Sequence, residues 1–429
     1  MLPTTTRHIL CFLTFLLIPA ACTEAAEYRF DCGMPDSPVM QGYDRLTAQD
    51  AYNAERGYGW QGARARHLEF RRPKRDNKLR GSFGQSLLEE AYDMHRNALN
   101  RDAVIGREDL GFRLDVPNGT YRVGITMGSL TQAIGSIDLS VNDRLVAEQA
   151  AVWAPGGYRM LDVTPAGWWT TFRTTVEVTD GAIQLGWKKN QTHYDTEFAK
   201  QAAAETPYAQ WYHTTPILKE PPYEYIGYPF AGHSVMAIEV MPHRPGPLES
   251  IDGKLRLTER INSPRLSEAI KLYNGGQFHS SAQLLTQVTE REAKVAKAVL
   301  GLWLSGRLET EIEQKIVPEC LAILRPYVKA HPEATGLVEI LWDAEIFQKA
   351  MLIHVNRGGD AESNHFLDND RAIGWWWMIQ PDSPLRDKAR LHLARAAHML
   401  KPYSPILGTE RQVFMELEKK CPENRFVKY

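Results

Sequence analysis

The spacing of apolar residues changes once along this chain, and that change constrains the fold more than any other feature. Before residue 242, apolar side chains recur at every second position, a period typical of β-strands with one buried face. After the stiff stretch Pro-His-Arg-Pro-Gly-Pro at 242–247, they recur at the spacing of an amphipathic helix. With 429 residues, 43% of them hydrophobic, the chain can bury two cores. We therefore expect a multi-domain protein, all-β and then all-α.

The first domain is predicted to be an antiparallel β-sandwich of roughly eight short strands. Alternating runs at 112–116 and 121–127 flank a Pro-Asn-Gly-Thr turn, so we expect these two strands to form a hairpin. The basic stretch 64–80 and the aromatic-rich stretch 192–232 lack this alternation and are expected to be loops. A loop as long as the second one is usually functional, which draws attention to its aromatic residues.

The second domain is expected to consist of short helices packed in pairs. One predicted helix face carries Leu266, Ala269, Ile270 and Tyr273. Gly275-Gly276 ends that helix, another begins near Phe278, and Pro384 marks the start of a later one. Such pairs resemble a degenerate tetratricopeptide array, without a clean repeat period. The predicted boundaries are 27–242 for the sandwich, 243–262 for a linker and 263–429 for the helical domain.

Residues 1–26 have the parts of an export signal peptide. Arg7 supplies the positive charge, residues 9–18 form an apolar stretch, and Pro19-Ala20-Ala21 resembles a cleavage site. The apolar stretch is too short to span a bilayer and no later one is longer, so we expect no transmembrane span. Cys22 leaves two outcomes open, simple cleavage or lipid attachment to that cysteine. The protein is therefore expected to be periplasmic, extracellular or lipid-anchored at the cell envelope.

Charge and cysteine content exclude two further classes of protein. Lys+Arg 50 against Asp+Glu 52 give a net charge of -2, which creates no field for a nucleic acid. Cys32, Cys320 and Cys421 remain after the signal peptide, which is no disulfide framework. A pair between Cys320 and Cys421 and single buried thiols are both consistent with this spacing.

Three aromatic and glycine motifs lie near the start of the predicted sandwich: Phe30-Asp-Cys-Gly33, Gln41-Gly-Tyr43 and Glu55-Arg-Gly-Tyr-Gly-Trp60. With the turn at 117–120, they resemble the galactose-binding-like jelly roll at the N-terminus of rhamnogalacturonan acetylesterases and lyases, and more distantly malectin-like domains. The resemblance covers about half of the chain and implies a domain that holds sugar polymers. The Gly-Asp-Ser and Asp-x-x-His motifs of the acetylesterases are not found in this sequence, so no catalytic residue is carried over.

Exposed aromatic rings are the expected contacts for a sugar, because the flat C–H face of a pyranose packs on a π-face. The predicted carbohydrate-binding residues are Trp153, Trp169, Tyr194, Trp211 and Tyr212. Burial in the core is the alternative for each of them, and it weighs most for the adjacent Trp168 and Trp169.

Metal sites have weaker support in the sequence. Asp31 and Asp44 are candidate ligands for a structural calcium ion, with ordinary turn carboxylates as the alternative. Potential ligands are also dense at 354–370, but neither a calcium loop nor His-Glu-x-x-His is present there, and solvated or capping side chains explain them. No other cofactor is expected.

These features together predict an exported carbohydrate-binding protein that serves polysaccharide degradation. The sandwich is expected to bind a polysaccharide or oligosaccharide through its loops, and the helical domain to hold a protein partner. The alternative is the non-catalytic N-terminal part of a polysaccharide lyase or esterase whose catalytic domain is incomplete or absent here. No complete catalytic constellation is found in the sequence, so the prediction favours binding over catalysis.

Overall fold

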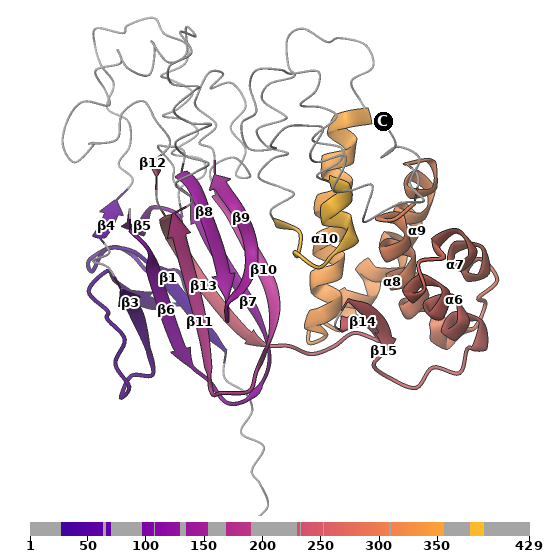
Figure 1. The fold of residues 1–429 in the computed structure, drawn as a ribbon, viewed down its shortest axis with the longest axis horizontal. Coiled ribbons are helices and arrows are strands. Elements are labelled where there is room, and N and C mark those ends of the chain that lie inside the picture. The colour runs from indigo at the N-terminus through magenta and orange to yellow at the C-terminus, as the bar shows by residue number, and fades with distance from the viewer. Residues whose placement is uncertain are drawn as a thin grey trace, which may run out of the picture.

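The computed structural model describes eleven parts of the chain: 27–62, 66–69, 97–106, 108–128, 134–152, 169–189, 230–231, 233–251, 253–308, 310–355 and 378–389. Strands fill the first part of the chain and helices the second, as the change of period predicts (Figure 1). In the described residues, no helix is both long enough and apolar enough to cross a bilayer. The predicted signal peptide, including Cys22, lies outside the described residues.

Two sheets form the β-region (Figure 1). The seven-stranded sheet consists of β10 (Trp169–Val178), β7 (Gly119–Gly128), β13 (His233–Pro242), β1 (Tyr28–Cys32), β2 (Asp44–Leu46), β5 (Asp102–Gly106) and β4 (Arg66–Glu69). The six-stranded sheet consists of β12 (Phe230–Ala231), β8 (Ile134–Val141), β11 (Ala182–Lys189), β6 (Leu110–Asp115), β3 (Tyr58–Gly62) and β9 (Arg144–Val152). All pairs are antiparallel except β1 with β2 and β12 with β8. The sheets thus hold more strands than the roughly eight predicted.

The two sheets pack face to face through large apolar side chains. Phe30 of one sheet meets Phe112 of the other, with ring centroids 5.6 Å apart. Trp187 reaches across to Met127, whose sulfur lies 3.3 Å from the indole nitrogen. All four side chains are at most 1% exposed, as expected for residues of one parity on a half-buried strand. The sandwich predicted from the period-two pattern is therefore confirmed.

The predicted hairpin between the runs at 112–116 and 121–127 is wrong. β6 pairs with β11 and β3, whereas β7 pairs with β10 and β13, so the turn carries the chain from one sheet to the other. A second crossover, from β10 to β11, lies beside it: Val116 donates to the Gly181 carbonyl, and Gly181 donates to the Asn118 side chain. Alternation of apolar residues is the same for a hairpin and a crossover, so the pattern could not separate them.

Three segments predicted to be irregular contain strands, since β12 (Phe230–Ala231) lies at the end of the predicted loop 192–232. β4 lies inside the predicted loop 64–80 and pairs with β5, so that prediction is wrong for residues 66–69. Within the predicted linker 243–262, β14 (Leu248–Ile251) and β15 (Lys254–Leu257) form a two-stranded hairpin. Leu248 and Leu255 are buried, so this hairpin packs against its surroundings rather than serving as a free spacer.

Helices follow the hairpin. They are α6 (Pro264–Asn274), α7 (Phe278–Leu285), the 3-10 turn η4 (Arg291–Ala293), α8 (Lys294–Ser305), α9 (Thr310–Ala330) and α10 (Thr335–Val355). Ser263 caps α6 through its hydroxyl, and Pro264 occupies the first turn, where its missing N–H has no cost. The predicted face of α6 is buried in full. Neighbouring helices pack in sequence order, and their tetratricopeptide character remains a prediction.

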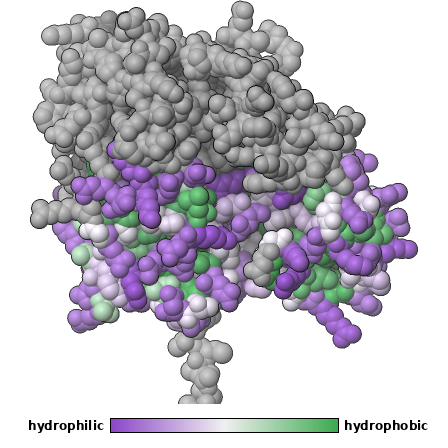
Figure 2. Space-filling view, viewed as in Figure 1, coloured by the Kyte–Doolittle hydropathy of each residue, from purple (hydrophilic) through white to green (hydrophobic). Residues whose placement is uncertain are grey.

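The β-region and the helices also pack against each other. On the face seen in Figure 2, hydrophilic residues cover most of the described surface of both parts, with apolar residues interspersed. Residues 378–389 lie between the two parts and contact each of them. Arg386 donates to the Val146 carbonyl of β9, and Lys388 donates to the Leu308 carbonyl after α8. This segment therefore ties the sandwich to the helices.

Candidate functional site

Several strands of the larger sheet begin or end at the same level. β7 ends at Gly128, directly beside Trp169, where β10 begins. Val235, near the start of β13, pairs with Met127, so β13 begins at this level as well. Segments that join these strands to other elements therefore attach to one end of the sheet.

The smaller sheet has a corresponding set of strand ends. Ile134, at the start of β8, pairs with Val152 at the end of β9, and Lys189 at the end of β11 pairs with Ile137. The connection 129–133 joins this sheet to the end of β7 and is too short to reach the opposite end of the sandwich. Connections 129–133, 153–168 and 190–229 thus all attach at one end of the sandwich, named the loop end below (Figure 1).

Trp169 marks the loop end on the outer face of the larger sheet. Residues of one parity in β10, such as Phe172, point into the space between the sheets, so Trp169 shares the opposite face with Arg173. Its ring is half-buried, and its cross-strand neighbour is Gly128, which has no side chain to cover it. Trp169 therefore lies on the outer face of the larger sheet and packs partly against the hydrophobic core.

The other predicted carbohydrate-binding residues lie outside the described residues. Trp153 directly follows β9 in sequence, and Tyr194, Trp211 and Tyr212 belong to the connection 190–229. Their attachment to the loop end follows from the strands on either side, while their own positions remain predictions.

The motif at 55–60 serves packing. Trp60 is 5% exposed and donates its indole N–H to the Thr47 carbonyl at 2.9 Å. Its ring lies 5.4 Å from that of Phe112 and 5.9 Å from that of Trp187, inside the core. Gly59 has φ +146, and a Cβ there would lie 2.5 Å from the Tyr52 nitrogen. Close packing therefore explains Gly59 and Trp60 of this motif.

Asp31 and Asp44 do not converge on a common point. Asp31 pairs with Arg45 across β1 and β2, and Asp44 pairs with Phe30, so the two carboxylates leave opposite faces of the sheet. The Asp31 carboxylate accepts the Met40 N–H at 2.7 Å. Burial raises its pKa to about 6, while that hydrogen bond opposes the shift. No group of three or more metal ligands forms within the described residues.

The interface between sandwich and helices holds an ionic cluster that the sequence analysis missed. Arg173 of β10 pairs with Glu339 and Asp343 of α10, and Arg122 of β7 pairs with Glu339 as well. These two carboxylates, four residues apart, share one helix face. The side chains of Arg173, Glu339 and Asp343 are 5%, 2% and 3% exposed. The available signal was the spacing of Glu339 and Asp343, one helical turn apart within the mainly apolar stretch 337–347, since buried charges are normally paired.

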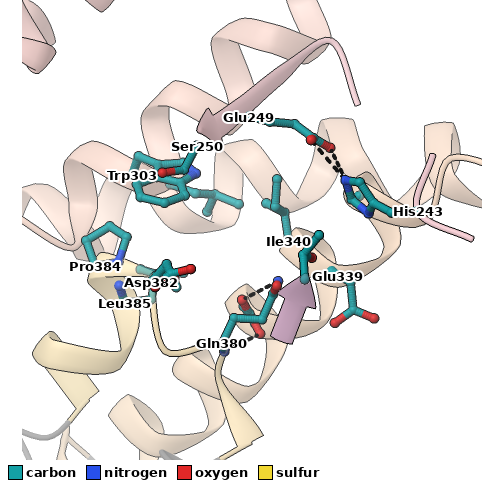
Figure 3. A pocket seen from close by; sticks show the side chains of 15 residues that line it. His243, Glu249, Ser250, Trp303, Glu339, Ile340, Gln380, Asp382, Pro384 and Leu385 are labelled. Atoms are coloured by element: carbon teal, nitrogen blue, oxygen red, sulfur yellow. Dashed lines mark hydrogen bonds and ion pairs between the residues drawn. The ribbon is translucent and has the colours of Figure 1, made fainter. Parts of the chain in front are cut away.

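A small cavity lies beside this cluster (Figure 3). Its lining includes His243, Glu249, Trp303, Asp343, Gln380 and Asp382. His243 pairs with Glu249 at 2.9 Å, so this carboxylate also has a partner. The cavity volume is about 90 Å³, far below the roughly 300–1,000 Å³ of small-molecule sites, and holds about three water molecules. It belongs to the domain interface rather than to a ligand site for a sugar.

The sequence matches no protein-family model and no curated protein sequence. Similar solved structures include a Bacteroides uniformis β-glucuronidase 2 with 10% identity and a TM-score of 0.27, over 51% of this chain and 18% of that chain. The ANXUR2 extracellular domain from Arabidopsis thaliana has 9% identity and a TM-score of 0.29, over 54% and 46%. CBM35 from Paenibacillus barcinonensis has 11% identity and a TM-score of 0.19, over 44% and 96%. This chain covers less than half of the first two proteins.

Proposed function

We propose that this chain is an exported carbohydrate-binding protein that holds a polysaccharide at the loop end of its sandwich, as an accessory to polysaccharide degradation. One observation carries the proposal: connections 153–168 and 190–229, which hold four of the five predicted sugar-contacting aromatics, attach to the same end of the sandwich as Trp169. Aromatic rings from several loops at one rim suit a polymer, because successive sugar rings pack on successive planes.

The chemistry of Trp169 supports the proposal further. Its indole lies on an outer face with only a glycine opposite, so one ring plane is not covered by that neighbour. The rings of Trp60 and Trp187, in contrast, are buried in the core. A sugar ring stacked on Trp169 would bury apolar surface of both partners, and loop amides and hydroxyls would supply hydrogen bonds.

Affinity gel electrophoresis of the full mature chain tests the proposal, with pectic and other polysaccharides cast in the gel. We expect retardation by at least one polysaccharide. Replacing Trp169, or Trp211 and Tyr212 together, by Ala should weaken binding about tenfold for each stacked ring lost.

Trp342→Ala is a matched control, because Trp342 is an indole 45% exposed on α10, a helix outside the sandwich and its connections. This variant should be retarded like the wild type. Equal mobility of the wild type with and without every polysaccharide would contradict the proposal. Retardation that survives all the loop-end substitutions would show binding elsewhere on the chain.

A further inference from the structure

We propose that Arg173, Glu339 and Asp343 form a pH-responsive clamp, which holds the helical region on the sandwich more firmly in acid than at alkaline pH. This inference concerns the domain interface and is independent of carbohydrate binding. Its basis is the unequal share of positive charge that the two buried carboxylates receive.

Glu339 is the better-compensated carboxylate. It pairs with both Arg122 and Arg173, which come from adjacent strands on the outer face of the larger sheet. Among the described residues, Asp343, one helical turn further along α10, has only its share of Arg173 as a positive partner, with Nη2 2.7 Å from Oδ1. One guanidinium thus serves two carboxylates that are at most 3% exposed, and an incompletely paired charge is costly at a buried position.

The other partner of Asp343 in the described part of the chain, Gln380, is neutral. Gln380 approaches with its backbone N–H at Oδ1 and its side-chain amide at Oδ2, both at 3.3 Å. A protonated carboxyl fits this arrangement too, since its O–H can donate to the amide oxygen of Gln380 after the amide turns over. Burial raises the pKa of Asp343 to about 7, Arg173 opposes the rise and the charge of Glu339 adds to it.

The sign of the pH effect follows from this shift. In the docked protein Asp343 has a pKa of about 7, against an ordinary value of 3.8 when the interface opens to water. Between these two values the docked state binds more protons than the open state, so raising the pH favours opening. The equilibrium constant for docking should therefore fall by up to about tenfold per pH unit from pH 4 to pH 7 and then level off.

Other charged groups face Asp343 from the elements packed around it. Arg122 and Arg173 come from the sandwich and Glu339 from the same helix. Across the cavity lie the His243–Glu249 pair and the more exposed Asp382, which pairs with Arg144 (Figure 3). Imidazoles in general change charge over this pH range, so His243 must be separated from Asp343 by a variant of its own.

Hydrogen exchange at one backbone amide reports opening of the interface. The Gly336 N–H, in the first turn of α10, donates to the Arg244 carbonyl at 2.9 Å, which lies just after β13. We would measure exchange of this amide in the full chain between pH 5 and pH 8, divided by its intrinsic rate at each pH. Wild-type protection should fall by up to about tenfold per unit to pH 7 and then become constant.

Three variants assign the effect to Asp343. Asp343→Asn mimics the protonated carboxyl, so its protection should stay at the acid level throughout. Glu339→Gln removes the charge that helps to raise the pKa of Asp343 in the docked protein, so the fall should level off at a lower pH. His243→Gln should keep the wild-type profile.

Asp382→Asn is the matched control, because it removes an exposed interface carboxylate and should leave the slope unchanged. Protection of the Gly336 amide that does not change with pH in the wild type would overturn the clamp. So would a wild-type pH dependence of protection in Asp343→Asn, or the loss of that dependence in His243→Gln. Should Asp343→Asn fail to fold, the pH dependence of protection in the wild type and in Glu339→Gln tests the clamp instead. Identical profiles in these two proteins would refute coupling between the two carboxylates.

Discussion

The phenol of Tyr121 donates a hydrogen bond to the carbonyl of Pro117, four residues earlier in the chain, at 2.9 Å. Tyr121 is 1% exposed, and the bond closes the crossover from β6 to β7. Pro117 lies in the exposed turn 117–120, whereas the phenol that it accepts from is buried, so the bond anchors the turn to the core. The crossover thus has a built-in lock of the kind found at corners of other β-sandwiches.

Tyr121→Phe should destabilise the sandwich by about 1 kcal/mol, because it removes the hydrogen bond between the buried phenol and the Pro117 carbonyl. Urea unfolding, followed by tryptophan fluorescence, measures the change. Tyr58→Phe is the control, since the Tyr58 hydroxyl has no hydrogen-bond partner among the described residues, and it should change stability by less than about 0.5 kcal/mol. Equal losses in both variants would argue against the lock.

Gly59→Ala should cost roughly 2–3 kcal/mol, because φ at this position is +146 and the added methyl group would lie 2.5 Å from the Tyr52 nitrogen. Gly42 also has a positive φ, +83, but nothing lies within 4 Å of the place that an added methyl group would take there. Gly42→Ala should therefore cost about 1 kcal/mol. The difference between the urea unfolding midpoints of the two variants measures the steric cost of the methyl group at residue 59. This difference should vanish if the loop around Tyr52 moves to make room for the methyl group.

The protein should lose stability in acid through His233. This side chain is 3% exposed, and burial lowers its pKa to about 3 from 6.5. The unfolded chain therefore binds a proton between pH 6.5 and about pH 3 that the folded chain does not, so the contribution of His233 to the free energy of unfolding falls by about 1.4 kcal/mol for each pH unit in this range. His233→Phe should flatten this slope in thermal unfolding at pH 4–7, whereas His331→Phe, at an exposed position, should not.

The mature chain should begin near Glu27 if export proceeds by simple cleavage. Intact-mass measurement of the protein from the extracytoplasmic fraction of an expressing bacterium gives the new N-terminus. A chain that begins at Cys22 with an added diacylglycerol mass would establish the lipid-anchored form instead. A protein that retains residues 1–26 in the cytoplasm would contradict export.

How much of the structure the sequence predicts depends on the range of each interaction. The helix at 264–274 and its buried face were predicted correctly, because its capping serine, first-turn proline and apolar spacing are all local. For Trp60, the sequence is compatible with packing and with ligand binding. Deciding between them required the rings of Phe112 and Trp187, which come from strands remote in sequence.

The amino-acid sequence by itself determined the order of the β and α regions and which alternate residues of each strand are buried, since both follow from the spacing of apolar residues. Only the tertiary structure decided that β6 and β7 belong to different sheets, that Asp31 and Asp44 face apart, and that Arg173 meets Glu339 and Asp343. The physical reason is that strand pairing and buried ion pairs join residues far apart in the chain, and the same local pattern is compatible with several such partners.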